Sequence, residues 1–379
     1  MSNTSVIVIG SLHHNTLGVI RSLGEAGISN QNVDILIVAK NHDLNNLITS
    51  SKYVNPKRVD FVDEYDQIES WLLNKDVESD AVVICCSDGA AEAVIRSGDS
   101  LKAKYKIPST LIPISELTIK STQGSIAKKC GLNVPFSEDF YVTQEINWSH
   151  FPCIIKPYRS ATGAGKNDVR ILSSQEELIR ALPSLGADKI QIQQYIDKEM
   201  EFQLIGCSLD AGEKIIIPGF TKLIRQPKNT NTGYLLYSPI DQLDYDREAV
   251  EKFIRTIGYS GLFSVEFIRG KDGKDYFLEI NMRNDGNAYC VESAGVNLPY
   301  IWVYYQTYGK MPDVPTTFTN PVYFIPDLND LKLAFKQIGP FKWLKQFREA
   351  QSHSIYNKQD MGPFKFEIKR QVKRVFGMK

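Results

Sequence analysis

The chain has 379 residues, with 44 Lys or Arg, 44 Asp or Glu and 42% hydrophobic residues. The zero net charge argues against nucleic acid or acidic lipid as a partner of the chain as a whole, because no overall field would draw the protein to either. No hydrophobic stretch is long enough to cross a bilayer, and the first residues lack a signal-peptide pattern. The six cysteines form no CxxC motif and the five histidines are scattered, so we expect buried thiols, a cytoplasmic location and no zinc site.

Residues 1–115 alternate hydrophobic strands with helical segments. Strands are predicted at 5–10, 33–40 and 81–86, and a helix at 17–27. This alternation is typical of βαβ units and predicts an α/β, Rossmann-like domain with a parallel sheet. After Gly10 the next glycine is Gly18, and the second strand ends at Lys40 rather than at an acid. Both departures argue against a nicotinamide-dependent dehydrogenase.

The pattern changes from residue 116 onward. A helix that includes residues 121–130 is expected to stop at Gly131, and further strands are predicted at 151–157, 190–196 and 201–210. A glycine-containing loop at 158–168 and a helix around 173–182 separate the first two of these strands. Paired strands with helices between them indicate α+β architecture.

A β-hairpin is predicted over residues 262–283 because Asp-Gly marks its turn. If residues 271–274 form the loop, Gly270 pairs with Asp275, and Glu266 then lies directly opposite Glu279. Two facing carboxylates destabilise a sheet, and a bound divalent cation reverses that effect. The hairpin therefore predicts a cation site between the two glutamates.

Asn281 and Arg283 extend this row, because alternate residues of a strand share one face. Glu266, Glu279 and the Asn281 carbonyl form an all-oxygen set that suits Mg²⁺. The guanidinium of Arg283 is suited to grip a phosphate. The alternative is an exposed strand whose charges are merely solvated, since short motifs are matched by chance.

Three features upstream point to a nucleotide, the first two of them to its phosphates. Lys156 ends a hydrophobic strand, where a cation is costly unless it meets an anion. The loop SATGAG at 160–165 carries small residues whose backbone N–H groups suit phosphate oxygens. Gln193 lies near a strand end that is suited to read an adenine edge, and Glu201 is placed to hold ribose hydroxyls.

Taken in order, Lys120, CIIKP, SATGAG, QQYIDKEMEF and SVEF…FLEINMR resemble the ATP-grasp superfamily of carboxylate–amine ligases. The resemblance covers about residues 1–310, and within the superfamily the chain is most similar to D-aspartate ligases and to enzymes of cell-envelope and polysaccharide pathways. It implies a pre-ATP-grasp domain at 1–115 and an α+β ATP-grasp domain at 116–310. The latter divides into a lid-bearing subdomain at 116–195 and a metal-binding subdomain at 196–310, and a short helical extension follows at 311–379.

The resemblance also implies ATP and Mg²⁺, or Mn²⁺ in its place, as cofactors. The implied ATP-binding residues are Lys120 and Lys156 for phosphates, Ser160, Ala161, Thr162, Gly163 and Gly165 for the lid, Gln193, Gln194, Tyr195 and Ile196 for adenine, and Glu201 for ribose. The implied metal ligands are Glu266, Glu279 and Asn281. Arg283 would stabilise the transferred phosphoryl group, and Lys222 and Arg225 would hold the γ-phosphate or a substrate carboxylate, unless that pair is only surface charge. The chain departs from the family pattern at Ile119, Gln193 and Met282.

The activity implied is phosphorylation of a small-molecule carboxylate by ATP, followed by attack of an amine on the acyl phosphate to form an amide. Two alternatives stay open, a non-catalytic ATP-binding regulator of the same fold and a carboxylase or purine-type ligase. A homodimer is also compatible with the resemblance. The basic tail at 363–379 either docks on the protein or makes weak contact with an anionic membrane.

Overall fold

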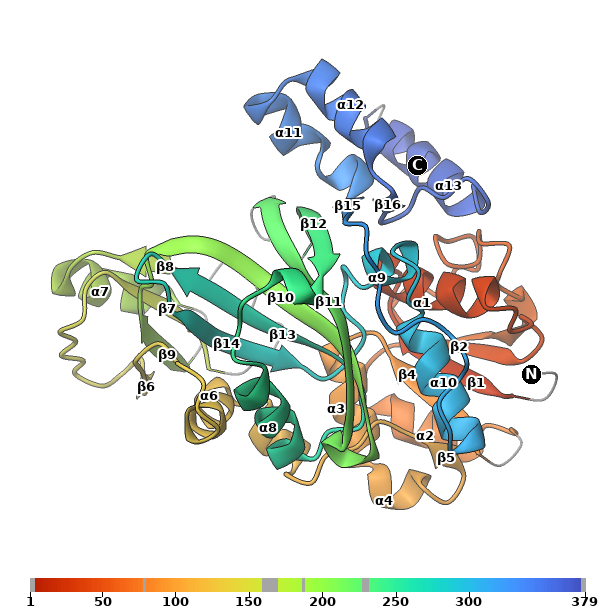
Figure 1. Cartoon of the computed structure of the whole chain (residues 1–379), viewed down its shortest axis with the longest axis horizontal. Coiled ribbons are helices and arrows are strands. Elements are labelled where there is room, and N and C mark those ends of the chain that lie inside the picture. Colours follow the sequence, from red (N-terminus) through yellow and green to blue (C-terminus); the bar gives the residue numbers. More distant parts are fainter. Residues whose placement is uncertain (1–3, 78–79, 159–169, 186–187, 227–231, 376–379) are drawn as a thin grey trace.

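The computed structural model describes residues 4–77, 80–158, 170–185, 188–226 and 232–375. The predicted lid residues Ser160, Ala161, Thr162, Gly163 and Gly165 lie outside these ranges. Three sheets, of five, seven and four strands, form the described framework. In Figure 1 the first sheet lies on the right, the seven-stranded sheet in the centre and the four-stranded sheet on the left.

The N-terminal sheet is parallel, in the order β3-β2-β1-β4-β5. Its strands are β1 (Val6–Gly10), β2 (Val33–Val38), β3 (Val59–Val62), β4 (Ala81–Cys85) and β5 (Tyr105–Lys106). The helices of this region are α1 (His14–Glu25), α2 (Gln67–Asn74), α3 (Asp88–Arg96), α4 (Gly98–Leu101) and α5 (Ile114–Leu117). This sheet confirms the predicted Rossmann-like α/β architecture.

Every residue of β1 and β4 is buried, as expected for parallel strands that are covered on both faces. The predicted strands match β1, β2 and β4 to within two residues, whereas the short, partly polar β3 was not predicted. Helix α1 begins three residues before the predicted start. The Nδ1 atom of His13 accepts a hydrogen bond from the Asn15 amide at 3.2 Å and so caps the first turn.

The seven-stranded sheet has the order β14-β13-β10-β11-β12-β15-β16. Its strands are β10 (Lys198–Leu209), β11 (Lys214–Arg225), β12 (Tyr234–Pro239), β13 (Gly261–Gly270), β14 (Asp275–Asn281), β15 (Val322–Ile325) and β16 (Ser352–His353). One face packs on α6 (Lys120–Lys129) and α8 (Arg247–Ile257) through a core that includes Phe202, Phe253 and Phe277. The opposite face of the β10–β13–β14 part carries the polar row described below.

The four-stranded sheet has the order β6-β9-β7-β8 and is covered by α7 (Gln175–Ala181). Its strands are β6 (Ser137–Tyr141), β7 (Cys153–Pro157), β8 (Arg170–Leu172) and β9 (Lys189–Gln194). The neighbours of β7 and β9 are all antiparallel, which confirms the predicted α+β character.

The remaining helices are α9 (Tyr289–Ser293), α10 (Leu298–Tyr308), α11 (Leu331–Gln337), α12 (Pro340–Glu349) and α13 (Gly362–Val375). The C-terminal extension is mainly helical, as predicted, and it also adds β15 and β16 to the central sheet. The segment after β16 returns to the N-terminal domain. There the fully buried Arg21 donates from Nε to Asp360 Oδ2 at 2.9 Å, and the Ser51 hydroxyl donates to the same oxygen at 2.7 Å. The predicted domain boundaries at 115, 195 and 310 stay predictions.

Candidate functional site

Glu266 on β13 lies directly opposite Glu279 on β14, as the hairpin pattern predicts. The route to this register differs from the prediction, because Asp275 pairs with Arg269 and not with Gly270. A β-bulge between Glu266 and Phe267 restores the alignment by one residue. The two glutamates therefore face each other even though the strand pairing next to the turn differs from the predicted pairing by one residue.

Amide side chains surround Glu266. Its Oε1 atom accepts hydrogen bonds from Gln203 Nε2 and from Asn281 Nδ2, both at 3.0 Å. Gln203 is the residue paired with Glu266 on β10, so its side chain shares this face. Asn281 is 6% exposed and also contacts Ser264 Oγ at 3.3 Å. Each of the predicted metal ligands thus lies on one polar face.

Two lysines reach this face from other elements. Lys120, at the start of α6, makes an ion pair with Glu279. Lys156, on β7, donates from Nζ to Gln193 Oε1 on β9 at 2.9 Å. The four-stranded sheet and the hairpin therefore contribute opposite charges to the same space.

Like charges lie close together in this space, the two glutamates on the hairpin and the two lysines opposite them. Burial and the facing carboxylate of Glu279 raise the pKa of Glu266 to about 7. Burial and the nearby Lys120 cation lower the pKa of Lys156 to about 7. A divalent cation beside the glutamates would favour the ionised form of Glu266, and phosphate between the lysines would favour the charged form of Lys156. These residues fit Mg²⁺ and the phosphates of ATP.

The raised pKa of Glu266 predicts a pH-dependent stability. Between its unfolded value of 4.5 and about 7, the folded state binds more protons than the unfolded state, so stability falls as pH rises. A glutamine side chain cannot ionise, so Glu266→Gln should not share this loss. The stability of Glu266→Gln relative to the wild type is therefore expected to rise from pH 5 to pH 8. Denaturant unfolding with EDTA measures this difference, and added Mg²⁺ should reduce it. The exposed Glu116→Gln serves as control. Equal pH profiles for both variants would contradict the prediction.

Arg283 links the hairpin to the N-terminal domain. Its Nε atom donates to Asp88 Oδ1 and its Nη1 atom to Asp285 Oδ2, both at 3.0 Å. Asp88 begins α3, immediately beyond the carboxyl end of β4. Asp285 also accepts a hydrogen bond from Ser264 Oγ at 2.9 Å. Arg283 is 8% exposed, and its guanidinium lies between the two carboxylates.

Sequence reasoning missed the polar residues that join the two domains here. Asn15 Nδ2 donates to the carbonyls of Cys86 (2.8 Å) and Asn284 (2.7 Å), and His14 Nε2 lies 3.1 Å from Thr232 Oγ1. Burial and the adjacent His13 keep the pKa of His14 well below its usual range, so its ring is neutral at pH 7. The available signal was the position of His13, His14 and Asp88 after β1 and β4, because loops at the carboxyl ends of parallel strands form sites.

The residues predicted for adenine and ribose lie around the end of β9. Gln193 is 5% exposed and binds Lys156, whereas the N–H groups of Gln194 and Tyr195 donate to the Phe136 and Pro152 carbonyls at 2.8 and 3.0 Å. Those two N–H groups are therefore already engaged. Ile196 follows in the connection to β10. Glu201 pairs with Lys198 at 2.7 Å and lies two residues before Gln203 on the same strand.

The two remaining predicted cations are not brought to the glutamate face. Lys222 is exposed and pairs with Phe202, whose ring packs in the hydrophobic core on the other face of the sheet. Because neighbours alternate along a strand, Lys222 points away from Gln203 and Glu266. Arg225 is 7% exposed, makes an ion pair with the fully buried Asp330 and lies over the Tyr234 ring. Its charge is therefore paired with a carboxylate of the C-terminal extension.

Comparison with known proteins supports one fold. The central part of the chain, residues 237–323, matches a family described as ATP-grasp in the biosynthetic pathway with Ter operon. Among solved structures, the N5-carboxyaminoimidazole synthetase from Staphylococcus aureus has a TM-score of 0.65 at 15% identity, over 89% of this chain and 86% of that one. The L-amino acid ligase from Bacillus licheniformis has a TM-score of 0.60 at 14% identity, over 81% and 75%. The chain has the ATP-grasp fold.

Curated relatives cover less of the molecule. The 2-oxoglutarate carboxylase small subunit of Hydrogenobacter thermophilus is 29% identical over 35% of this chain and 30% of its own length. The N5-carboxyaminoimidazole ribonucleotide synthase of Staphylococcus haemolyticus is 25% identical over 60% of each. The chain thus spans 30% and 60% of the lengths of these two relatives.

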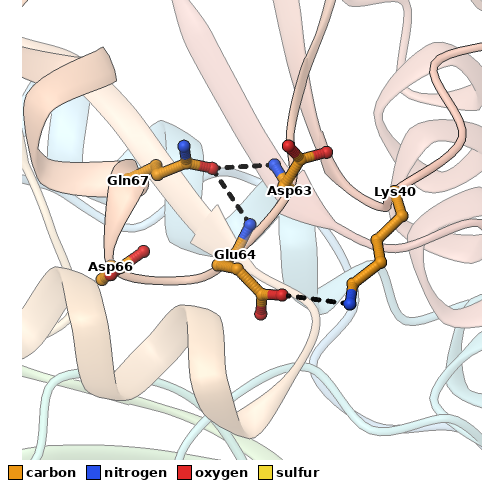
Figure 2. A pocket seen from close by; sticks show the side chains of 5 residues that line it. All are labelled: Lys40, Asp63, Glu64, Asp66 and Gln67. Atoms are coloured by element: carbon orange, nitrogen blue, oxygen red, sulfur yellow. Dashed lines mark hydrogen bonds and ion pairs between the residues drawn. The ribbon is translucent and has the colours of Figure 1, made fainter.

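A separate pocket of about 550 Å³ lies at the carboxyl ends of β2 and β3 (Figure 2), and its lining includes none of the residues predicted to bind ATP. Its lining residues are Lys40, Asp63, Glu64, Asp66 and Gln67. Gln67 Oε1 accepts hydrogen bonds from the Asp63 and Glu64 amides at 2.8 and 3.1 Å, and Lys40 lies 3.6 Å from Glu64. Its Lys40–Glu64 pair is solvent-exposed, and exposed pairs of this kind contribute little. This pocket has no part in the ATP-grasp site proposed below.

Within the described ranges, no group of three or more His, Cys, Asp or Glu side chains is placed to hold a metal ion. The polar face of the hairpin carries two carboxylates, Glu266 and Glu279, and the amide of Asn281. Such a set suits Mg²⁺, which commonly uses one or two carboxylates and completes its shell with substrate phosphates and water.

Proposed function

We propose that the protein is an ATP- and Mg²⁺-dependent ligase that joins a small-molecule carboxylate to an amine. The observation that carries this proposal is the meeting of two carboxylates and two lysines in one space. Glu266 and Glu279 face each other on the hairpin, while Lys120 and Lys156 approach from α6 and β7. Separately, each pair is unfavourable; together they match a metal–triphosphate complex, which carries both signs of charge.

In this proposal Lys120 and Lys156 bind phosphates, Glu201 binds ribose, and the segment from Gln193 to Ile196 lies beside adenine. Since the Gln194 and Tyr195 amides are engaged, the carbonyl of Gln194 is the group assigned to the adenine amino group. Glu266, Glu279 and Asn281 would hold Mg²⁺, which would neutralise charge on the phosphates.

Arg283 is assigned to the reacting centre because it lies beyond the metal ligands and contacts Asp88 of the other domain. A substrate carboxylate oxygen attacks the γ-phosphorus, the bond to the β–γ bridging oxygen breaks, and ADP leaves. The amine nitrogen then attacks the acyl carbon, the bond from that carbon to the phosphate oxygen breaks, and the amine loses a proton. The guanidinium fork suits the charge that develops on the transferred group.

The experiment is phosphate release from MgATP with a panel of carboxylates, each with and without amines. Hydroxylamine added in place of the amine should trap an activated carboxylate as its hydroxamate. A carboxylate that gives hydroxamate only with MgATP supports the proposal. Nucleotide binding without phosphate release or hydroxamate for any carboxylate would favour the non-catalytic regulator instead.

A carboxylase or purine-type ligase is the second candidate, and the two curated relatives favour it. In that case bicarbonate takes the place of the organic carboxylate. Labelled bicarbonate incorporated into an acceptor, with ADP formed, would distinguish it. The finer resemblance to D-aspartate ligases and cell-envelope enzymes stays a prediction, as does a homodimer.

A further inference from the structure

Basic residues are concentrated in the C-terminal extension. Residues 331–379 contain 12 Lys or Arg and 3 Asp or Glu, a net charge of +9 in a chain whose overall net charge is 0. Asp360 and Glu367 are each 2% exposed and are paired with Arg21 and Arg370. Glu349 is therefore the remaining acid that this segment exposes, so its surface is strongly cationic.

Helix α12 exposes hydrophobic side chains among these cations. Phe341 is 87% exposed and Leu344 is 49% exposed. Lys345 and Arg348 are also exposed, and intervals of three and four residues place all four on one side of the helix. The buried Trp343 lies on the opposite side, where its ring contacts Phe335. The outer face of α12 thus combines hydrophobic and cationic groups.

Helix α13 repeats this combination. Ile368 and Val372 are 41% and 43% exposed, and Lys365 and Lys369 are exposed at helical intervals beside them. The inward side of the helix carries Phe364, whose ring contacts Phe347 and Tyr356. Figure 1 shows α11, α12 and α13 at the periphery of the molecule, beyond β15 and β16.

We propose that the exposed faces of α12 and α13 bind the surface of an anionic lipid bilayer. Lysine and arginine are attracted to anionic headgroups, and hydrophobic side chains between them enter the headgroup–acyl boundary. Nucleic acid would satisfy the cations but would offer Leu344, Ile368 and Val372 no hydrophobic surface, so the bilayer is favoured. Within the ranges that the structure describes, no helix has the length and hydrophobicity to cross a bilayer.

The test is co-sedimentation of the whole chain with vesicles of phosphatidylcholine alone or with about one third phosphatidylglycerol. Binding is expected only with the anionic vesicles, and it should weaken from 0.1 M to 1 M salt as the Debye length falls from about 10 Å to 3 Å. Since each cation at such a surface contributes about fivefold, Lys345→Glu with Lys369→Glu should weaken binding at least about tenfold. Phe341→Ala with Leu344→Ala should weaken it by at least about tenfold as well.

Two matched changes elsewhere act as controls, Leu111→Ala at a residue that is 74% exposed and Lys57→Glu at an exposed lysine. Neither control should alter vesicle binding. The helix variants should retain wild-type circular dichroism and phosphate release, so the result is independent of the proposed ligase activity. Failure to bind anionic vesicles, or equal losses in the controls, would overturn the proposal. Retention on nucleic acid without vesicle binding would also overturn it.

Discussion

Arg283→Lys is expected to lower kcat at least about a hundredfold, the effect of losing one transition-state donor. The guanidinium of Arg283 contacts Asp88 and Asp285 through separate nitrogens, so it stands in a fixed plane between the two domains. Lysine keeps the charge but cannot reproduce this fork. The affinity for MgATP should change by less than about tenfold, because Lys120, Lys156 and the carboxylates remain.

Steady-state turnover and calorimetric MgATP binding, measured on the same preparations, check this prediction. Arg269→Lys is the matched control, because Arg269 on the same hairpin contacts Asp275 through two nitrogens at 2.7 and 2.8 Å. Arg283→Ala is a poorer first choice, since an unpaired buried Asp285 would cost about 3–5 kcal/mol of stability. Near-normal turnover in Arg283→Lys would show that Arg283 does not act at the reacting centre.

Glu279→Gln is expected to weaken MgATP binding by roughly a hundredfold, at the top of the range for residues that support a metal site. Glutamine keeps one acceptor oxygen but loses the charge that faces Glu266 and pairs with Lys120. The remaining oxygen set is then too weakly charged to hold Mg²⁺ beside phosphate.

Nucleotide affinity measured with Mg²⁺ and with EDTA isolates this effect. In the wild type, Mg²⁺ should strengthen binding, whereas in Glu279→Gln the two affinities should converge. Glu138→Gln, at an exposed glutamate of β6, is the control and should retain the Mg²⁺ dependence. An unchanged Mg²⁺ response in Glu279→Gln would place the metal elsewhere.

Strand alternation predicted the facing glutamates, but the predicted turn register was off by one residue and the bulge compensated for that error. The sequence did not predict the bulge, whose cause is tertiary. Phe277 lies two residues before Glu279, yet it must face the core, where its ring contacts Phe267 with the centroids 6.0 Å apart. The bulge lets Phe277 and Glu279 occupy opposite faces. A period of two alone would have placed them on the same face.

Contacts between distant segments account for what sequence reasoning missed. Arg283 and Asp88 are 195 residues apart, and Arg225 and Asp330 are 105 apart. Nothing near Arg225 in the chain indicates that a buried carboxylate neutralises it, so its pattern resembled that of Lys222. The two cations differ only in where the sheet and the C-terminal extension place them.

The contact between Arg21 and Asp360 has a consequence for biosynthesis. The two residues are 339 positions apart, and Arg21 has no exposed surface once the contact is made. Domains fold from the N-terminus as the ribosome adds about 5–20 residues per second, so α1 emerges at least about 17 s before Asp360. Until then the guanidinium lacks Asp360, the carboxylate with which it forms its buried ion pair. The packing around Arg21 is therefore completed only after Asp360 has been synthesised, and a translation product that ends before Asp360 would lack this buried ion pair.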